Sequence, residues 1–196
     1  MCAKMGISDF FGCVIPEKLV LDGLAIEAKL DGTAIRDLIP ERGRALYAER
    51  AVILDGNEHP RCLVMVSVTE EICEGHMPGA PILPLALGGW MLSQAGEILV
   101  AYTSRQAGEN GTVPIVYKVG AVQSKSRDFL IPGDCLILEA ELVNQRLALR
   151  EVNTTAWIAG GNQVVAMPDV LYTTIDLDQL KRRVCEQLER RKCDAS

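Results

Sequence analysis

The chain has 196 residues, of which 48% are hydrophobic and 23% are charged, a balance typical of a globular domain and unlike that of a disordered chain. Its formal net charge of −6 gives no broad basic field, so we expect no nucleic-acid partner. No run of about 18 apolar residues and no secretory signal are recognisable, so we expect a cytoplasmic protein with no membrane partner.

Residues 1–36 show no clear periodicity, and their apolar clusters predict an N-terminal extension that packs on the body of the protein. Residues 37–40 predict the end of a short helical turn, which Pro40 closes. Two strands are predicted at 44–54 and 61–68, the second of them rich in β-branched residues. The turn signal Asp55-Gly56-Asn57 joins them into an antiparallel hairpin.

A loop with three prolines follows at 76–84, and then a segment without proline runs from Leu85 to about Tyr102. This segment is apolar on almost all sides, which predicts a helix that is buried from every direction. Its glycines, Gly88, Gly89 and Gly96, lower helix propensity, and we expect them to let a sheet approach closely.

The second half is rich in predicted strands, at 113–122, 135–143, 147–159 and 163–175. Turn signals precede the second of these strands and separate the last two. One long apolar helix against an antiparallel sheet is an α+β architecture, and a sheet wrapped around a single buried helix is the hot-dog arrangement. The predicted organisation is an extension at 1–36, a hot-dog domain at 37–175 and a C-terminal segment at 176–196.

The C-terminal segment is predicted to form an exposed amphipathic helix over 176–192. Its apolar stripe consists of Leu177, Leu180, Val184 and Leu188. Basic residues fall in two runs, at 181–183 and 190–192. We interpret the helix as a solvated face with a packed stripe, and a contact with a carrier protein or a second subunit is the alternative.

The seven cysteines are scattered and form no CxxC pair, which predicts reduced thiols and no metal site. Most of them are expected to serve as small buried hydrophobes. Cys73 lies three residues before His76, so a nucleophilic Cys–His pair is an alternative. No glycine-rich nucleotide motif is present, and the sequence predicts no cofactor.

The chain has two histidines. His59 lies in a turn-like context that favours a surface residue. His76 lies between a predicted strand and the long buried helix, in a loop that its prolines order. The first N–H groups of a helix and the positive end of its dipole can stabilise an oxyanion at such a place. A single histidine is often structural, so this context leaves both a functional and a structural role open.

The residues that follow Glu74 carry a longer pattern, Gly-His-Met-Pro-Gly-Ala-Pro-Ile-Leu-Pro over 75–84. Gln94-Ala95-Gly96 follows eighteen residues after His76, Phe129-Leu-Ile-Pro-Gly-Asp134 comes later, and 156–165 reads as a strand, glycines and a strand. In this order the segments resemble the bacterial (3R)-hydroxyacyl-acyl-carrier-protein dehydratases, whose active-site motif is usually written GHFPGxPxxPG. The resemblance runs from about Asp37 to Ile175.

This resemblance implies a hot-dog fold that forms homodimers, or trimers of dimers, with the acyl chain in a tunnel at the dimer interface. The substrate would be an acyl thioester of a carrier protein or of coenzyme A. The family histidine removes the α-proton, an acid on the partner's central helix protonates the leaving hydroxyl, and a backbone N–H at the helix start polarises the carbonyl. His76 matches the catalytic base, and the expected substrate-binding positions are Gly79, Leu85, Trp90, Gln94 and Phe129.

Two positions depart from the family pattern. The family's helix-start glycine is Leu85 here, which keeps the backbone N–H but adds a side chain that would crowd the site. The family's acid falls at Trp90, and an indole cannot deliver a proton as a carboxylic acid can. Glu97 would face the same side of the helix about 10 Å further along, too far for the same proton. Glu71 and Glu74 near the loop, or a water held by Ser93 or Gln94, are further candidates for the proton donor.

The sequence therefore supports two hypotheses. The first is a dehydratase-like enzyme with altered acid chemistry, or a related thioester hydrolase or isomerase that needs only a base. The second is a non-catalytic acyl-binding or scaffolding subunit, which Trp90 and Leu85 motivate and which includes mixed assembly with an active paralogue.

Overall fold

The computed structural model describes residues 2–56, 59–125, 129–146 and 149–194. In chain order the elements are α1 (Cys2–Phe11), β1 (Ala25–Leu30), α2 (Gly32–Leu38), the 3-10 helix η1 (Gly43–Ala45), β2 (Arg50–Asp55), β3 (Arg61–Ser67), α3 (Glu70–Cys73), α4 (Leu85–Gln106), β4 (Thr112–Lys118), β5 (Gln123–Ser124), β6 (Cys135–Arg146), β7 (Leu149–Ile158), β8 (Gln163–Asp176) and α5 (Leu177–Asp194). The described strands form one antiparallel sheet in the order β1-β2-β3-β6-β7-β8-β4, with β5 paired to β8.

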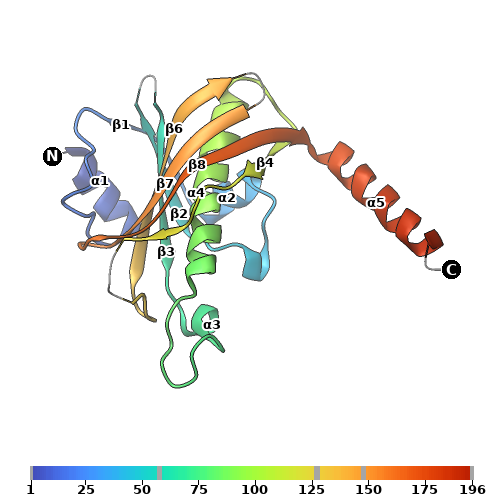
Figure 1. Cartoon of the computed structure of the whole chain (residues 1–196). Coiled ribbons are helices and arrows are strands. Elements are labelled where there is room, and N and C mark those ends of the chain that lie inside the picture. The colour runs from blue at the N-terminus through green and yellow to red at the C-terminus, as the bar shows by residue number, and fades with distance from the viewer. Residues whose placement is uncertain (1, 57–58, 126–128, 147–148, 195–196) are drawn as a thin grey trace.

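The long helix α4 lies along one face of the sheet and contacts β3, β4, β6, β7 and β8 (Figure 1). Every residue from Met91 to Ala101 is buried, as the apolar run predicted. Burial of apolar side chains on all sides is the main force that holds this helix in the curve of the sheet. The α+β hot-dog fold predicted from the sequence is confirmed.

Two glycines of α4 show how closely the sheet approaches the helix. A Cβ atom at Gly96 would overlap the hydroxyl of Tyr172, which donates a hydrogen bond to the Ser93 carbonyl at 2.9 Å. A Cβ atom at Gly88 would lie 3.7 Å from Val165, an ordinary van der Waals distance. The expected role of glycine in close helix–sheet packing is thus confirmed most clearly at Gly96.

The two glycines make a matched pair for a stability test. Gly96→Ala is expected to destabilise the protein by about 1–3 kcal/mol, because the added methyl group displaces the Tyr172 ring in a packed core. Gly88→Ala is expected to be neutral or stabilising, since alanine is favoured over glycine inside a helix by about 1 kcal/mol. Urea unfolding of both variants measures the difference, and equal stability of the two would contradict this packing.

The N-terminal residues contribute more to the sheet than the sequence indicated. No strand was predicted before residue 37, yet β1 pairs with β2 and forms an edge of the sheet. Only Leu30 of β1 is buried, so this edge strand carries little of the apolar alternation that reveals a strand. Helix α2 begins at Gly32. Asp31 caps its N-terminus, because its side chain accepts hydrogen bonds from the N–H groups of Thr33 and Ala34 at 2.9 Å each.

A second core lies on the face of the sheet opposite α4. Ala51 and Ile53 of β2 belong to the core around α4, whereas Val52 and Leu54 pack with Ile7 of α1 and its neighbours. Because successive strand residues point to opposite faces, β2 is buried on both sides. The N-terminal segment therefore covers the outer face of the sheet.

Several predicted boundaries differ from the structure. The first predicted strand begins only at Arg50, because η1 and an extended segment precede it, and the strand predicted at 113–122 ends at Lys118 before the short β5. The helix predicted to end near Tyr102 continues to Gln106, and α3 was not predicted. The predicted turn residue Asn57 and the predicted strand start at Leu147 lie outside the described residues.

The C-terminal helix α5 extends away from the body of the protein (Figure 1). Val184 and Leu188 of its apolar stripe are 46% and 51% exposed, so the expectation of a packed stripe is wrong for these two residues within one chain. No helix in the described part of the chain is long and apolar enough to span a membrane.

Candidate active site

His76 lies in the loop between α3 and α4, and its side chain is exposed. Its Nδ1 atom lies 3.1 Å from the carbonyl oxygen of Ile82. A carbonyl can only accept, so this contact is a hydrogen bond when Nδ1 carries the proton. The other ring nitrogen, Nε2, then keeps its lone pair and can act as a base.

The backbone of the same loop fixes the position of the ring. Gly79 has a φ of 78°, which a residue with a side chain rarely adopts, and the adjacent Ala80 N–H donates to the Met77 carbonyl at 3.0 Å. At the end of the loop, the Leu83 N–H donates to the Leu130 carbonyl at 2.8 Å. This bond joins the histidine loop to the segment before β6.

A pocket of about 220 Å³ opens beside His76. Its walls are mainly apolar and include Leu85 and Gly88 of α4, Phe129 and Val165, while Ser124 of β5 adds a hydroxyl. Such walls suit an acyl chain, and a few polar groups suit its reacting end. Ser124 and Val165 were not predicted as site residues: Ser124 lies outside the segments that resemble the family, and Val165 is the last residue of the matched segment 156–165, for which no site role was inferred.

The N-terminus of α4 lies at this pocket. Pro84 precedes the helix, and no side chain in the described part of the chain caps it. The first N–H groups of a helix have no partner inside the helix, and the helix dipole adds partial positive charge there. The backbone N–H of Leu85 is thus available for an oxyanion, while the Leu85 side chain, 44% exposed, forms part of the pocket wall.

Of two further predicted substrate-binding residues, Phe129 and Gln94, only Phe129 lines the pocket beside His76. Phe129 lines the pocket and is 71% exposed. Gln94 is fully buried on α4, where it accepts from the Tyr47 N–H at 3.0 Å and donates to the Ala45 carbonyl. Both ends of the amide are engaged by backbone, so Gln94 holds residues 45–47 against the helix and does not line the His76 pocket.

Trp90 lies on another face of α4 from the pocket. Five residues along a helix correspond to a rotation of about 140°, which separates Trp90 from Leu85. The indole is 47% exposed and contacts the Tyr47 ring edge-on, with 6.0 Å between ring centroids. Within one chain, Trp90 therefore does not reach the ring of His76 through this pocket.

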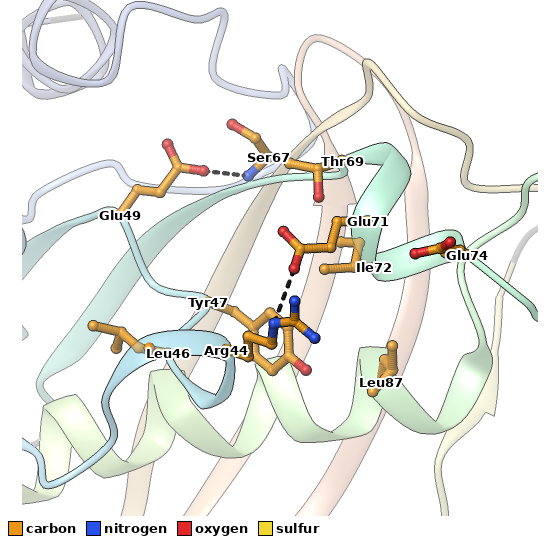
Figure 2. Close-up of a pocket in the computed structure, with 11 residues that line it drawn as sticks. Arg44, Leu46, Tyr47, Glu49, Ser67, Thr69, Glu71, Ile72, Glu74 and Leu87 are labelled. Carbon is orange, nitrogen blue, oxygen red and sulfur yellow. Dashed lines mark hydrogen bonds and ion pairs between the residues drawn. The ribbon is translucent and has the colours of Figure 1, made fainter.

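A larger pocket, of about 610 Å³, lies between the segment from η1 to β2, the end of β3, α3 and the first turn of α4 (Figure 2). Glu71 and Glu74 line it, and Glu71 forms an exposed ion pair with Arg44 at 3.1 Å. Neither glutamate lines the pocket of His76. The larger pocket is lined by Leu87 of α4 but not by His76 or Leu85, so the smaller pocket is the better candidate for the reaction.

Glu97 is buried beside Glu41 and Tyr172. Burial first, and then the neighbouring Glu41 carboxylate, raise the pKa of Glu97 to about 9. Glu97 is thus a neutral acid near pH 7, but it lines neither pocket. The structure does not place it where it could protonate a substrate held at His76.

The alternative of a nucleophilic cysteine is not supported. Cys73 is 1% exposed, and burial raises the pKa of its thiol. A thiol without access to solvent and with a raised pKa forms little of the reactive thiolate. Among the residues that the structure describes, no group of three or more metal-ligating side chains is placed to hold a metal ion.

Comparison with known proteins places this geometry in context. No model of a known protein family matches the sequence. The chain is 33% identical over 150 residues to the 3-hydroxyacyl-[acyl-carrier-protein] dehydratase FabZ of Levilactobacillus brevis. The aligned residues cover 76% of this chain and 96% of that protein. It is 34% identical over 128 residues to the FabZ of Lactobacillus helveticus, covering 65% of this chain and 82% of that protein.

Two solved structures share the fold. A chain of the dehydratase heterocomplex ApeI:P from Xenorhabdus doucetiae aligns with a TM-score of 0.58 at 13% identity, covering 76% of this chain and 96% of that chain. A thioesterase superfamily member from Thermus thermophilus aligns with a TM-score of 0.53 at 16% identity. The alignment covers 65% of this chain and 92% of that chain. These likenesses show the hot-dog fold, whereas the sequence relatives identify the family. The chain belongs to the family of the FabZ-type 3-hydroxyacyl-[acyl-carrier-protein] dehydratases.

Proposed function

We propose that this protein is a (3R)-hydroxyacyl-thioester dehydratase of fatty-acid or related acyl-chain biosynthesis, with acid chemistry altered at position 90. The observation that carries the proposal is the position of His76, at an apolar pocket and at the N-terminus of α4. The FabZ relatives favour a thioester of acyl carrier protein as the substrate, and coenzyme A is the alternative carrier. No cofactor takes part.

In the proposed reaction, Nε2 of His76 removes the α-proton of the 3-hydroxyacyl thioester. The negative charge then moves to the thioester oxygen, which the Leu85 N–H and the dipole of α4 stabilise. Loss of the 3-hydroxyl group, which leaves as water once it is protonated, forms the carbon–carbon double bond. Trp90 cannot supply that proton, so it comes from water or from the imidazolium ring of His76 itself.

We further propose a homodimer, and a trimer of dimers as the larger assembly. Two features support an interface. β4 is an edge strand of the described sheet, with Tyr117 70% exposed, and Trp90 leaves a large apolar side chain 47% exposed. Large exposed apolar groups of this kind favour contact with another chain.

A non-catalytic acyl-binding or scaffolding subunit is the second candidate function, because an indole at position 90 removes the family's acid. Two related reactions, isomerisation of the double bond and hydrolysis of the thioester, are less affected by the loss of the acid. In the isomerisation, removal of a proton by the base is enough to start the reaction. The variants of Trp90 described next distinguish a site that lacks only an acid from one that has another task.

Trp90→Glu is expected to raise the rate of dehydration of a (3R)-hydroxyacyl-carrier-protein by about 10²-fold or more, because a general acid typically contributes 10²–10⁴-fold. Formation of the enoyl thioester is the measurement. Trp90→Gln is the matched control, with nearly the same shape but no ionisable proton, and it should give no such gain. If neither the native protein nor either variant forms the enoyl thioester, the non-catalytic function is favoured.

A further inference from the structure

Two cysteines far apart in the sequence meet on the outer face of the sheet. Cys13 follows α1, and Cys135 is the first residue of β6. Both pack against the second core that α1 forms with the sheet. Cys13 and Cys135 therefore lie in one cluster on that face, and each thiol contributes to the pKa shift of the other.

The surrounding backbone holds this pair in place from both sides. The Gly160 N–H donates to the Val14 carbonyl at 2.8 Å, and the adjacent Ala159 N–H donates to the Cys135 carbonyl at 2.8 Å. The segment after Cys13 and the backbone of Cys135 are therefore bonded to consecutive residues of the same turn. A close approach of two cysteines on fixed backbones is the geometric requirement for a disulfide.

The pair is also accessible, unlike two of the other cysteines. Cys13 and Cys135 are both partly exposed, whereas Cys62 and Cys73 are buried. A small oxidant in solvent can reach the first two thiols and not the last two. Cys185 on α5 is exposed but lies on the helix that projects away from the body (Figure 1).

We propose that Cys13 and Cys135 form a reversible disulfide that locks the N-terminal segment onto β6, with a peroxide as the oxidant. One thiolate attacks a peroxide oxygen, which gives a sulfenic acid and one water. The second sulfur attacks the sulfenic sulfur, the S–S bond forms, and the hydroxyl group leaves as a second water after it takes up the remaining thiol proton. The two sulfur atoms lose two electrons in all, and the peroxide gains them.

The environment of the two thiols determines the pH at which they react. Burial raises the pKa of both thiols, and that of Cys135 reaches about 12. At Cys13 the neighbouring Cys135 thiol and the charge of Arg50 oppose the effect of burial. Oxidation should be slow at neutral pH and faster as pH rises, because only the thiolate reacts.

The bond would change the behaviour of the whole N-terminal segment. It closes a covalent loop from residue 13 to residue 135, which contains the elements from β1 to β5, and a cross-link over a long loop restricts the unfolded chain strongly. The oxidised protein is therefore expected to unfold at a higher urea concentration than the reduced protein. Dithiothreitol should reverse the shift.

The test uses the full-length protein, treated with hydrogen peroxide and digested without reducing agent. Mass spectrometry is expected to find a peptide pair linked through Cys13 and Cys135, and the urea midpoint should rise. Cys13→Ser and Cys135→Ser should each abolish both results, whereas Cys185→Ser, the matched control, should retain both. If Cys13 and Cys135 stay separately open to alkylation after peroxide treatment, or if peroxide raises the urea midpoint of Cys13→Ser as much as that of the native protein, the proposal is overturned.

Discussion

Replacing His76 by asparagine is expected to lower the rate of dehydration by about 10²–10⁴-fold, the usual contribution of a general base. Asparagine can still donate a hydrogen bond toward the Ile82 carbonyl, which His76 contacts at 3.1 Å, but it has no nitrogen that accepts a proton. The loop should therefore keep its shape while the reaction loses its base. Enoyl-thioester formation under single-turnover conditions measures the loss separately from substrate binding.

The chain offers a matched control for this variant. His59 also places Nδ1 at 3.1 Å from a backbone carbonyl, that of Leu142, but it lies outside the pocket. His59→Asn removes the same chemical group from a similar contact and should leave turnover unchanged. Equal losses from the two variants would mean that the histidine at position 76 supports the fold and not the reaction.

Glu97→Gln is expected to raise the free energy of unfolding at pH 8, on the order of 2–4 kcal/mol. The pKa of Glu97 is about 9 in the folded protein against an ordinary value of 4.5, chiefly because the side chain is buried and Glu41 lies beside it. Between these two values the folded state holds a proton that the unfolded state has released. The native protein should therefore lose stability as pH rises from about 4.5 toward 9.

The glutamine variant removes this dependence, because an amide does not ionise and its N–H can donate to the Glu41 carboxylate. Urea unfolding at several pH values is the measurement, with the two proteins expected to be similar near pH 4.5 and to diverge above it. Glu186→Gln on the exposed face of α5 is the control and should leave the pH profile unchanged. A native stability that does not fall over this range would show that Glu97 titrates normally.

The sequence predicted the features of the fold that depend on local patterns. The apolar run from Leu85 predicted α4, because burial on all sides leaves a continuous apolar stretch. The β-branched run at 61–68 and the turn signal before it predicted the β2–β3 hairpin. The motif around His76 predicted the loop and its place before α4. Each of these signals lies within about twenty neighbouring residues.

Features that depend on contacts between distant segments were not predictable. Gln94 fits a family motif, but its partners at residues 45 and 47 are known only once the chain is folded. The pairing of Glu41 with Glu97, and of Cys13 with Cys135, likewise joins segments that no local pattern connects. β1 was missed because an edge strand with one buried residue has almost no periodic apolar signal.

The most direct test of the proposed function is exchange of the α-hydrogen of a (3R)-hydroxyacyl-carrier-protein with deuterium from solvent. This step needs the base and the oxyanion site but not the acid that Trp90 replaces, so it isolates the role of His76. We predict exchange of one α-hydrogen by the native protein and by His59→Asn, and none by His76→Asn. A native protein that binds the thioester but leaves both α-hydrogens unexchanged would contradict the assignment of His76 as the catalytic base.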